Sequence, residues 1–107
     1  MDEATYANLA DGTFTKIVRA LDALDAEDVD CDRAGDVLTL TFKSGKRCIV
    51  NTQRPTRQVW LAFGTQAWHF SYDGDKSAWL DDKGRPGDLL STLADIVKGE
   101  SGQAPAF

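Results

Sequence analysis

The stretch Asn51-Thr52-Gln53-Arg54-Pro55-Thr56-Arg57-Gln58-Val59-Trp60-Leu61 lies mid-chain in a protein of 107 residues. Apolar and polar residues alternate on both sides of Pro55. Such alternation is typical of strands with one buried face, and proline cannot donate to a backbone ladder. We therefore predict that one strand ends near Pro55 and another begins at Gln58, with Val59 and Leu61 facing a core and Trp60 facing away.

The same two-residue period predicts a sheet of about six short strands. Besides Gln58–Ala62, these are expected over Val29–Arg33, Val37–Phe42, Lys46–Gln53, Trp68–Tyr72 and Ala78–Asp81. The inward residues of the second and third strands are Leu38, Leu40, Phe42, Cys48 and Val50. The connections are too short for parallel crossovers, so we expect an antiparallel meander.

A helix is expected at each end of this set of strands. Apolar residues recur at three- and four-residue steps over residues 4–24, with Asp2 placed to cap the helix, and again over Leu89–Val97, where Pro86 can open it. Residues 101–107 read as an irregular tail. One domain over 1–107 is therefore expected, an α+β two-layer sandwich with both helices on one face of the antiparallel sheet.

Composition is that of a globular protein, with 42% hydrophobic and 27% charged residues. No apolar run approaches the roughly 20 residues that span a bilayer. The acidic start, Met1-Asp2-Glu3, lacks the features of a secretory or organelle leader, so a cytoplasmic protein is expected.

Cys31 and Cys48 match no zinc or disulfide spacing, and we interpret both as small buried side chains.

Charge is unevenly distributed along the chain. Residues 1–36 carry a net charge of −7, residues 37–62 carry +5, and residues 63–107 carry −3. This separation predicts a dipolar surface that could orient a charged partner before contact.

A belt of carboxylates precedes and enters the first strand, at Asp22, Asp25, Glu27, Asp28, Asp30 and Asp32. Oxygen ligands of this kind suit hard or multivalent cations, held weakly and with water still bound. An EF-hand is excluded because, counted from Asp28, the sixth and twelfth positions are Arg33 and Thr39. A solvated edge that prevents sheet-to-sheet association is the alternative.

Outward positions of neighbouring strands place Trp60 with Asn51, Gln53, Ile49 and His69, rimmed by Arg47, Arg54 and Arg57. Tryptophan and arginine are common interface anchors, so this face is a candidate docking surface. Two alternatives stay open: Phe63 could cover Trp60, or the face could stack single-stranded nucleic acid. No nucleophile accompanies His69, so a catalytic triad is not indicated.

The pattern Asn51-x-Gln53-x-Pro55-x-x-Gln58-Val59-Trp60-Leu61 resembles the signature of the frataxin family, in its bacterial branch. Asp30-Cys31-Asp32, the run from Gly35 to Phe42, and Asp88-Leu89-Leu90 also resemble it. The resemblance covers nearly the whole chain in order.

This resemblance implies an iron-binding protein of iron–sulfur cluster assembly. Ferrous and ferric iron would bind the acidic belt, at Asp22, Asp25, Glu27, Asp28, Asp30 and Asp32. A cysteine desulfurase and its scaffold partner would contact the open face, at Asn51, Gln53, Gln58, Trp60 and His69, with Arg54 and Arg57 at the rim. Val18 and Arg19 stand where relatives often have acidic residues, so we expect fewer or weaker iron sites.

The expected role is regulatory or delivery-related rather than enzymatic, with only weak ferroxidase-type activity considered. We expect a monomer that binds neither nucleic acid nor membrane, with iron-driven oligomerisation left open. The main rival is a ferroxidase and iron-storage oligomer, although the Glu-x-x-His pairs of di-iron bundles are missing from the sequence.

Overall fold

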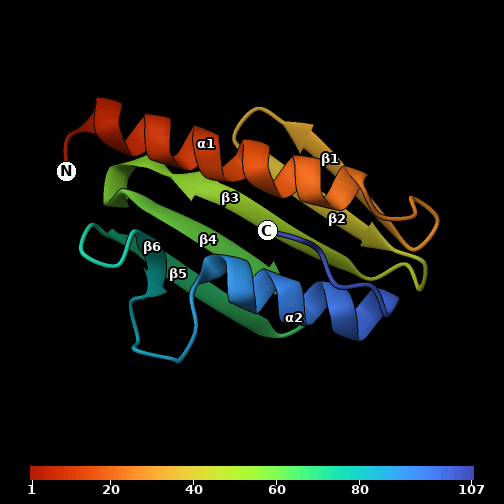
Figure 1. Cartoon of the computed structure of the whole chain (residues 1–107). Helices are drawn as coiled ribbons and strands as arrows, with labels where there is room; N and C mark the ends of the chain where they lie inside the picture. Colours follow the sequence, from red (N-terminus) through yellow and green to blue (C-terminus); the bar gives the residue numbers. More distant parts are fainter.

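Two helices lie on one side of a six-stranded sheet in the computed structural model, which describes residues 1–107 (Figure 1). In chain order the elements are α1 (Glu3–Asp22), β1 (Val29–Ala34), β2 (Val37–Phe42), β3 (Arg47–Gln53), a 3₁₀ turn η1 (Arg54–Thr56), β4 (Gln58–Phe63), β5 (Gln66–Asp73), β6 (Ala78–Asp81) and α2 (Leu89–Ser101). All strand pairs are antiparallel, in the order β1-β2-β3-β4-β5-β6. The predicted α+β sandwich and meander are confirmed.

The core fills the space between the helices and one sheet face. Every second residue of β2 is buried there, namely Leu38, Leu40 and Phe42. The helices contribute residues spaced three or four apart, such as Phe14 and Ile17 of α1. Each such side chain contributes about 1.5–3 kcal/mol when it leaves water. Burial on this one face is what assigns the alternate residues of every strand to the other face.

Helix ends are set by capping. The Asp2 carboxylate accepts from the Thr5 backbone N–H at 2.7 Å, as predicted. The prediction that Pro86 opens the second helix is wrong: α2 begins at Leu89, and Asp88 and Ser91 form a reciprocal capping box. Gly87 has φ +90°, which is incompatible with a helix at that position. Neither helix is long and apolar enough to cross a bilayer.

The C-terminal segment is irregular but packed. Ser101 still belongs to α2, so the tail begins one residue later than predicted, at Gly102 with φ +75°. Phe107 then packs against the core. The Gln103 side-chain amide donates to Asp28 Oδ2 at 2.7 Å. The tail thereby joins the end of α2 to the loop that precedes β1.

An ion pair fixes the connection between β6 and α2. Arg85 donates to both oxygens of Asp81, at 3.0 Å and 3.1 Å, and its guanidinium lies 5.0 Å from the Trp68 ring centroid. The Asp81 side chain is almost fully buried. The hydrogen bonds from Arg85 hold the pKa of this carboxyl below its usual value of 3.8.

Leu40 and Ile49 test the assignment of the two sheet faces, because Leu40 is 0% exposed and Ile49 is 40% exposed. Leu40→Ala should lower the free energy of unfolding by about 2–5 kcal/mol, since it leaves a cavity. Ile49→Ala should lower it by less than about 1 kcal/mol. Urea unfolding followed by circular dichroism measures both, and equal losses would contradict the assignment.

The Asp81–Arg85 pair predicts a pH-dependent stability difference. Because folding lowers the pKa of Asp81, the pair stabilises the fold above about pH 3.8 and less as pH falls through the lowered pKa. Asp81→Asn should therefore be less stable than the parent at pH 7, and this gap should shrink at pH 3. Urea unfolding at both pH values checks it, with Asp75→Asn as an exposed control. A gap that stays constant or widens in acid would show that the pair does not act in this way.

Candidate functional site

The outward residues of the sheet form rows that cross the strands. The register places Val37 opposite Asn51, Asn51 opposite Trp60, and Trp60 opposite His69. The next row contains Gln53, Gln58 and Ser71. The predicted docking residues of β3, β4 and β5 are thus brought together on the face that the helices leave open, which we call the open face.

No element covers the open face. Its Val37 and Ile49 are the large apolar side chains that remain exposed in the sheet, at 37% and 40%. The alternative in which Phe63 covers Trp60 is wrong, because Phe63 packs edge-to-face on Phe42 at the core, 6.0 Å between ring centroids. Exposed apolar side chains beside an aromatic are typical of interaction surfaces.

Trp60 faces outward, as predicted, but it is half-buried because neighbouring side chains cover part of it. Its indole stacks on the His69 ring, with centroids 4.1 Å apart and planes 18° apart. The indole N–H donates to Gln58 Oε1 at 2.9 Å. Gln58 Nε2 in turn donates to Ser71 Oγ at 3.1 Å and to Asp82 Oδ2 at 3.3 Å. Trp60 therefore has one defined orientation in the free protein.

Asp82 belongs to this network and was missed by the sequence analysis. Its Oδ2 lies 3.7 Å from His69 Nδ1, and its backbone N–H donates to the His69 carbonyl at 2.8 Å. The residue follows the last residue of β6 and reads in the sequence as part of a turn. Extending β6 by one residue would have placed Asp82 on the open face, because side chains alternate and Leu80, two residues earlier, faces that side.

The two side-chain amides of β3 differ in whether they already make a hydrogen bond within the chain. The Asn51 side chain donates to the Thr52 carbonyl at 3.2 Å. The half-buried Gln53 side chain makes no hydrogen bond within the chain. Gln53 therefore presents a donor and an acceptor that a partner's backbone could use.

Of the two arginines predicted at the rim, Arg54 lies on the helix side of the sheet, whereas Arg57 caps the η1 turn between β3 and β4. Arg54 pairs with Asp36, Nε to Oδ2 at 3.3 Å, and lines a hollow with Tyr6 and Phe14 on the helix side of the sheet. Arg57 adopts a left-handed backbone with φ +54° and donates to the Arg54 carbonyl at 2.6 Å. Neither arginine joins the row of Trp60, and the charge of Arg54 is compensated.

The carboxylates of the predicted belt, called here the acidic ridge, follow the edge of the molecule at β1. Asp22 ends α1, the next three lie in the loop, and Asp30 and Asp32 share the open face with Thr41 and Thr39. Asp25 accepts from the Glu27 backbone N–H at 3.0 Å, and Asp28 accepts from Gln103. The other four make no hydrogen bond or ion pair with their side chains, which leaves their charge uncompensated.

The ridge is an open row of carboxylates rather than a closed chelate. No three His, Cys, Asp or Glu side chains lie close enough together to hold a metal ion. Burial and the charges of Asp22, Asp30 and Asp32 raise the pKa of the Cys31 thiol to about 11. Burial raises the pKa of Cys48 to about 12. Both thiols are therefore harder to ionise than a free cysteine, which makes them poorer metal ligands.

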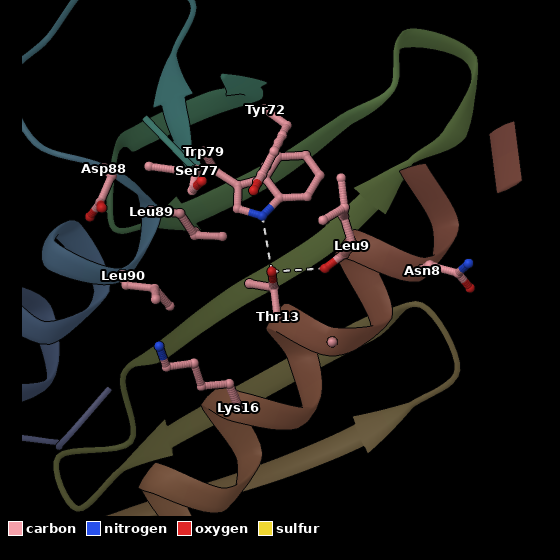
Figure 2. Close-up of a pocket in the computed structure, with 12 residues that line it drawn as sticks. Asn8, Leu9, Thr13, Lys16, Tyr72, Ser77, Trp79, Asp88, Leu89 and Leu90 are labelled. Atoms are coloured by element: carbon pink, nitrogen blue, oxygen red, sulfur yellow. Dashed lines mark hydrogen bonds between the residues drawn. The ribbon is translucent and has the colours of Figure 1, made fainter. Parts of the chain in front are cut away.

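A hollow of about 290 Å³ lies between α1, the β5–β6 hairpin and the start of α2 (Figure 2). At its centre the Trp79 indole N–H donates to Thr13 Oγ1 at 3.0 Å, and Thr13 Oγ1 donates to the Leu9 carbonyl at 2.9 Å. Asp88 at its margin caps α2. The indole N–H and the Thr13 hydroxyl are paired with each other and Asp88 is engaged in the cap, so the hollow is a weaker candidate site than the open face.

The sequence is similar to that of known proteins. Residues 1–103 match the family model described as a frataxin-like domain. The chain is 33% identical over 103 residues to the iron-sulfur cluster assembly protein CyaY of Tolumonas auensis, which covers 96% of this chain and 95% of the relative.

Solved structures show the same fold. The frataxin of Psychromonas ingrahamii superposes with a TM-score of 0.87 at 31% identity, covering 98% of this chain and 96% of the other. Trimeric frataxin from the yeast Saccharomyces cerevisiae, complexed with ferrous iron, superposes with a TM-score of 0.76 at 20% identity, covering 89% and 87%. With its sequence matched from residue 1 to 103 and its fold shared, the chain belongs to the frataxin-like family.

Proposed function

We propose that this protein regulates or assists iron–sulfur cluster assembly in two ways: it binds iron weakly on the acidic ridge, and it docks through the open face on a cysteine desulfurase and its scaffold partner. The observation that carries the proposal is an uncovered sheet face with a held tryptophan beside a row of uncompensated carboxylates. The CyaY relative, named for cluster assembly, supports the pathway.

Iron is cargo in this proposal, not a resident cofactor. Separate carboxylates on an exposed edge can each contribute an oxygen to a hydrated ion, but they do not replace its water shell. Binding then depends mainly on the summed negative potential of the ridge. We therefore expect weak, exchangeable binding of ferrous or ferric iron.

Docking would use different residues for orientation and for contact energy. The negative ridge steers the protein towards a basic surface, which speeds association. The open face then buries Trp60, Val37 and Ile49 and offers the Gln53 amide. A binding and regulatory role, not a catalytic one, fits the lone histidine of the chain, which stacks on Trp60 instead of facing a nucleophile.

Anaerobic titration with ferrous iron should perturb backbone amide signals of residues 22–32 before others, because the uncompensated carboxylates lie there. The double variant Asp30→Asn, Asp32→Asn should weaken binding roughly 3- to 10-fold through lost charge. Asp73→Asn with Asp75→Asn, in the β5–β6 turn, is the charge-matched control. Perturbation that avoids residues 22–32, or equal weakening by both pairs, would refute the iron assignment. Light scattering during the titration would reveal the storage oligomer instead.

Trp60→Ala should weaken binding to the desulfurase–scaffold complex by about 2 kcal/mol, roughly 30-fold, because it removes the largest side chain of the open face. Its free energy of unfolding should change by only about 1 kcal/mol, the scale of one aromatic stack. Calorimetric titration and urea unfolding measure the two effects. Asn8→Ala, on the exposed side of α1, is the control, and unchanged binding by Trp60→Ala would rule out docking through this face.

A further inference from the structure

A hydrogen-bond chain of fixed direction runs across the open face from Asp82 to Trp60. An ionised carboxylate only accepts hydrogen bonds, and an indole N–H only donates them. Between the two stands the Gln58 amide, which has a donor end and an acceptor end. In the structure its Nε2 faces Asp82 Oδ2 at 3.3 Å and its Oε1 faces Trp60 Nε1 at 2.9 Å.

Only one orientation of the Gln58 amide satisfies both neighbours. If the amide turned over, its oxygen would face the Asp82 carboxylate and its NH₂ would face the indole N–H, so both contacts would become repulsive. Ser71 Oγ, 3.1 Å from Gln58 Nε2, can donate or accept and so does not select an orientation. The charge of Asp82 is therefore what makes Gln58 present an acceptor to the indole.

The same carboxylate also acts on the other support of the indole. Asp82 Oδ2 lies 3.7 Å from His69 Nδ1, at the edge of the ring that stacks on Trp60. The backbone of Asp82 is fixed relative to that of His69, because its N–H donates to the His69 carbonyl at 2.8 Å. One side chain thus biases both the hydrogen bond and the stack that hold Trp60.

We propose that Asp82 is a positioning residue for Trp60, which sets the orientation of the indole before a partner arrives. This inference rests on the proposed docking function and extends it to a residue outside the motif of β3 and β4. An indole that is already held loses less conformational freedom on docking than a mobile one. Loss of the Asp82 carboxylate should therefore weaken docking by about 3- to 10-fold, because the Trp60 indole is no longer held in its docking orientation.

The free protein gives the first test. Nuclear magnetic resonance of Asp82→Ala should show a shifted Trp60 indole N–H signal and weaker contacts between the Trp60 and His69 rings. Asp82→Asn, whose side-chain oxygen can still accept from Gln58, should show smaller changes. Asp75→Asn, an exposed carboxylate of the β5–β6 turn, should leave both unchanged. An unchanged indole signal and intact ring contacts in Asp82→Ala would overturn the proposal.

A charge exchange separates positioning from general structural damage. In the double variant Gln58→Glu, Asp82→Asn, the carboxylate at 58 accepts from the indole and the amide at 82 donates to that carboxylate, so the direction of the chain is restored with no change in net charge. Its indole signal and ring contacts should return towards those of the parent. Gln58→Glu alone places a second carboxylate against that of Asp82, so its indole signal and ring contacts should be the most perturbed. A double variant as perturbed as Gln58→Glu alone would contradict the mechanism.

Docking on the desulfurase–scaffold complex gives the last test, with Trp60→Ala measured beside it. The proposal expects Asp82→Ala to bind 3- to 10-fold more weakly and the exchanged double variant to recover most of that loss. If Trp60→Ala weakens docking but Asp82→Ala does not, positioning by Asp82 is refuted while the docking face stands. If Trp60→Ala has no effect, the docking function fails, and the resonance experiment alone decides whether Asp82 orients the indole.

Discussion

One-sided burial of the sheet is the constraint on which the rest of the structure depends. Side chains alternate along a strand, so burying Leu38, Leu40 and Phe42 under the helices commits the residues between them to the opposite face. The register carries that commitment from strand to strand, up to Trp60 and His69. A shift of one residue in any strand would exchange the two faces, and the core would not form.

The open face then has to keep a large aromatic in water without losing its order. Stacking on His69 and the hydrogen bond to Gln58 achieve this within the sheet itself, with no covering loop. The acidic ridge lies at one edge of the same sheet, on β1 and the loop before it. Contact and charge are thus carried by separate strands. Under the proposed function, long-range attraction by the ridge would precede close packing at Trp60.

Much of this could be predicted because it follows from local pattern. Alternation gave β2 and β6 with the bounds observed, and it placed Trp60 and His69 outward together. Other features depend on contacts that no local pattern encodes. The direction of Arg54 is set by its pairing with Asp36, and the role of Asp82 by a neighbour on another strand. The start of α2 is different, because its capping box of Asp88 and Ser91 is a local pattern that sequence reasoning missed. The proposed partner and the proposed iron binding came from the resemblance, because alternation alone indicates neither.

In the proposed function, the open face and not the helix layer contacts the desulfurase–scaffold complex. Amide hydrogen exchange of the protein, free and bound, tests it directly because both layers are read in one experiment. We predict that docking adds protection to amides of β3, β4 and β5 around Asn51, Trp60 and His69. Exchange in α1 and α2 should stay unchanged. Protection confined to the outer surfaces of α1 and α2, with the open face unaltered, would contradict docking through the open face.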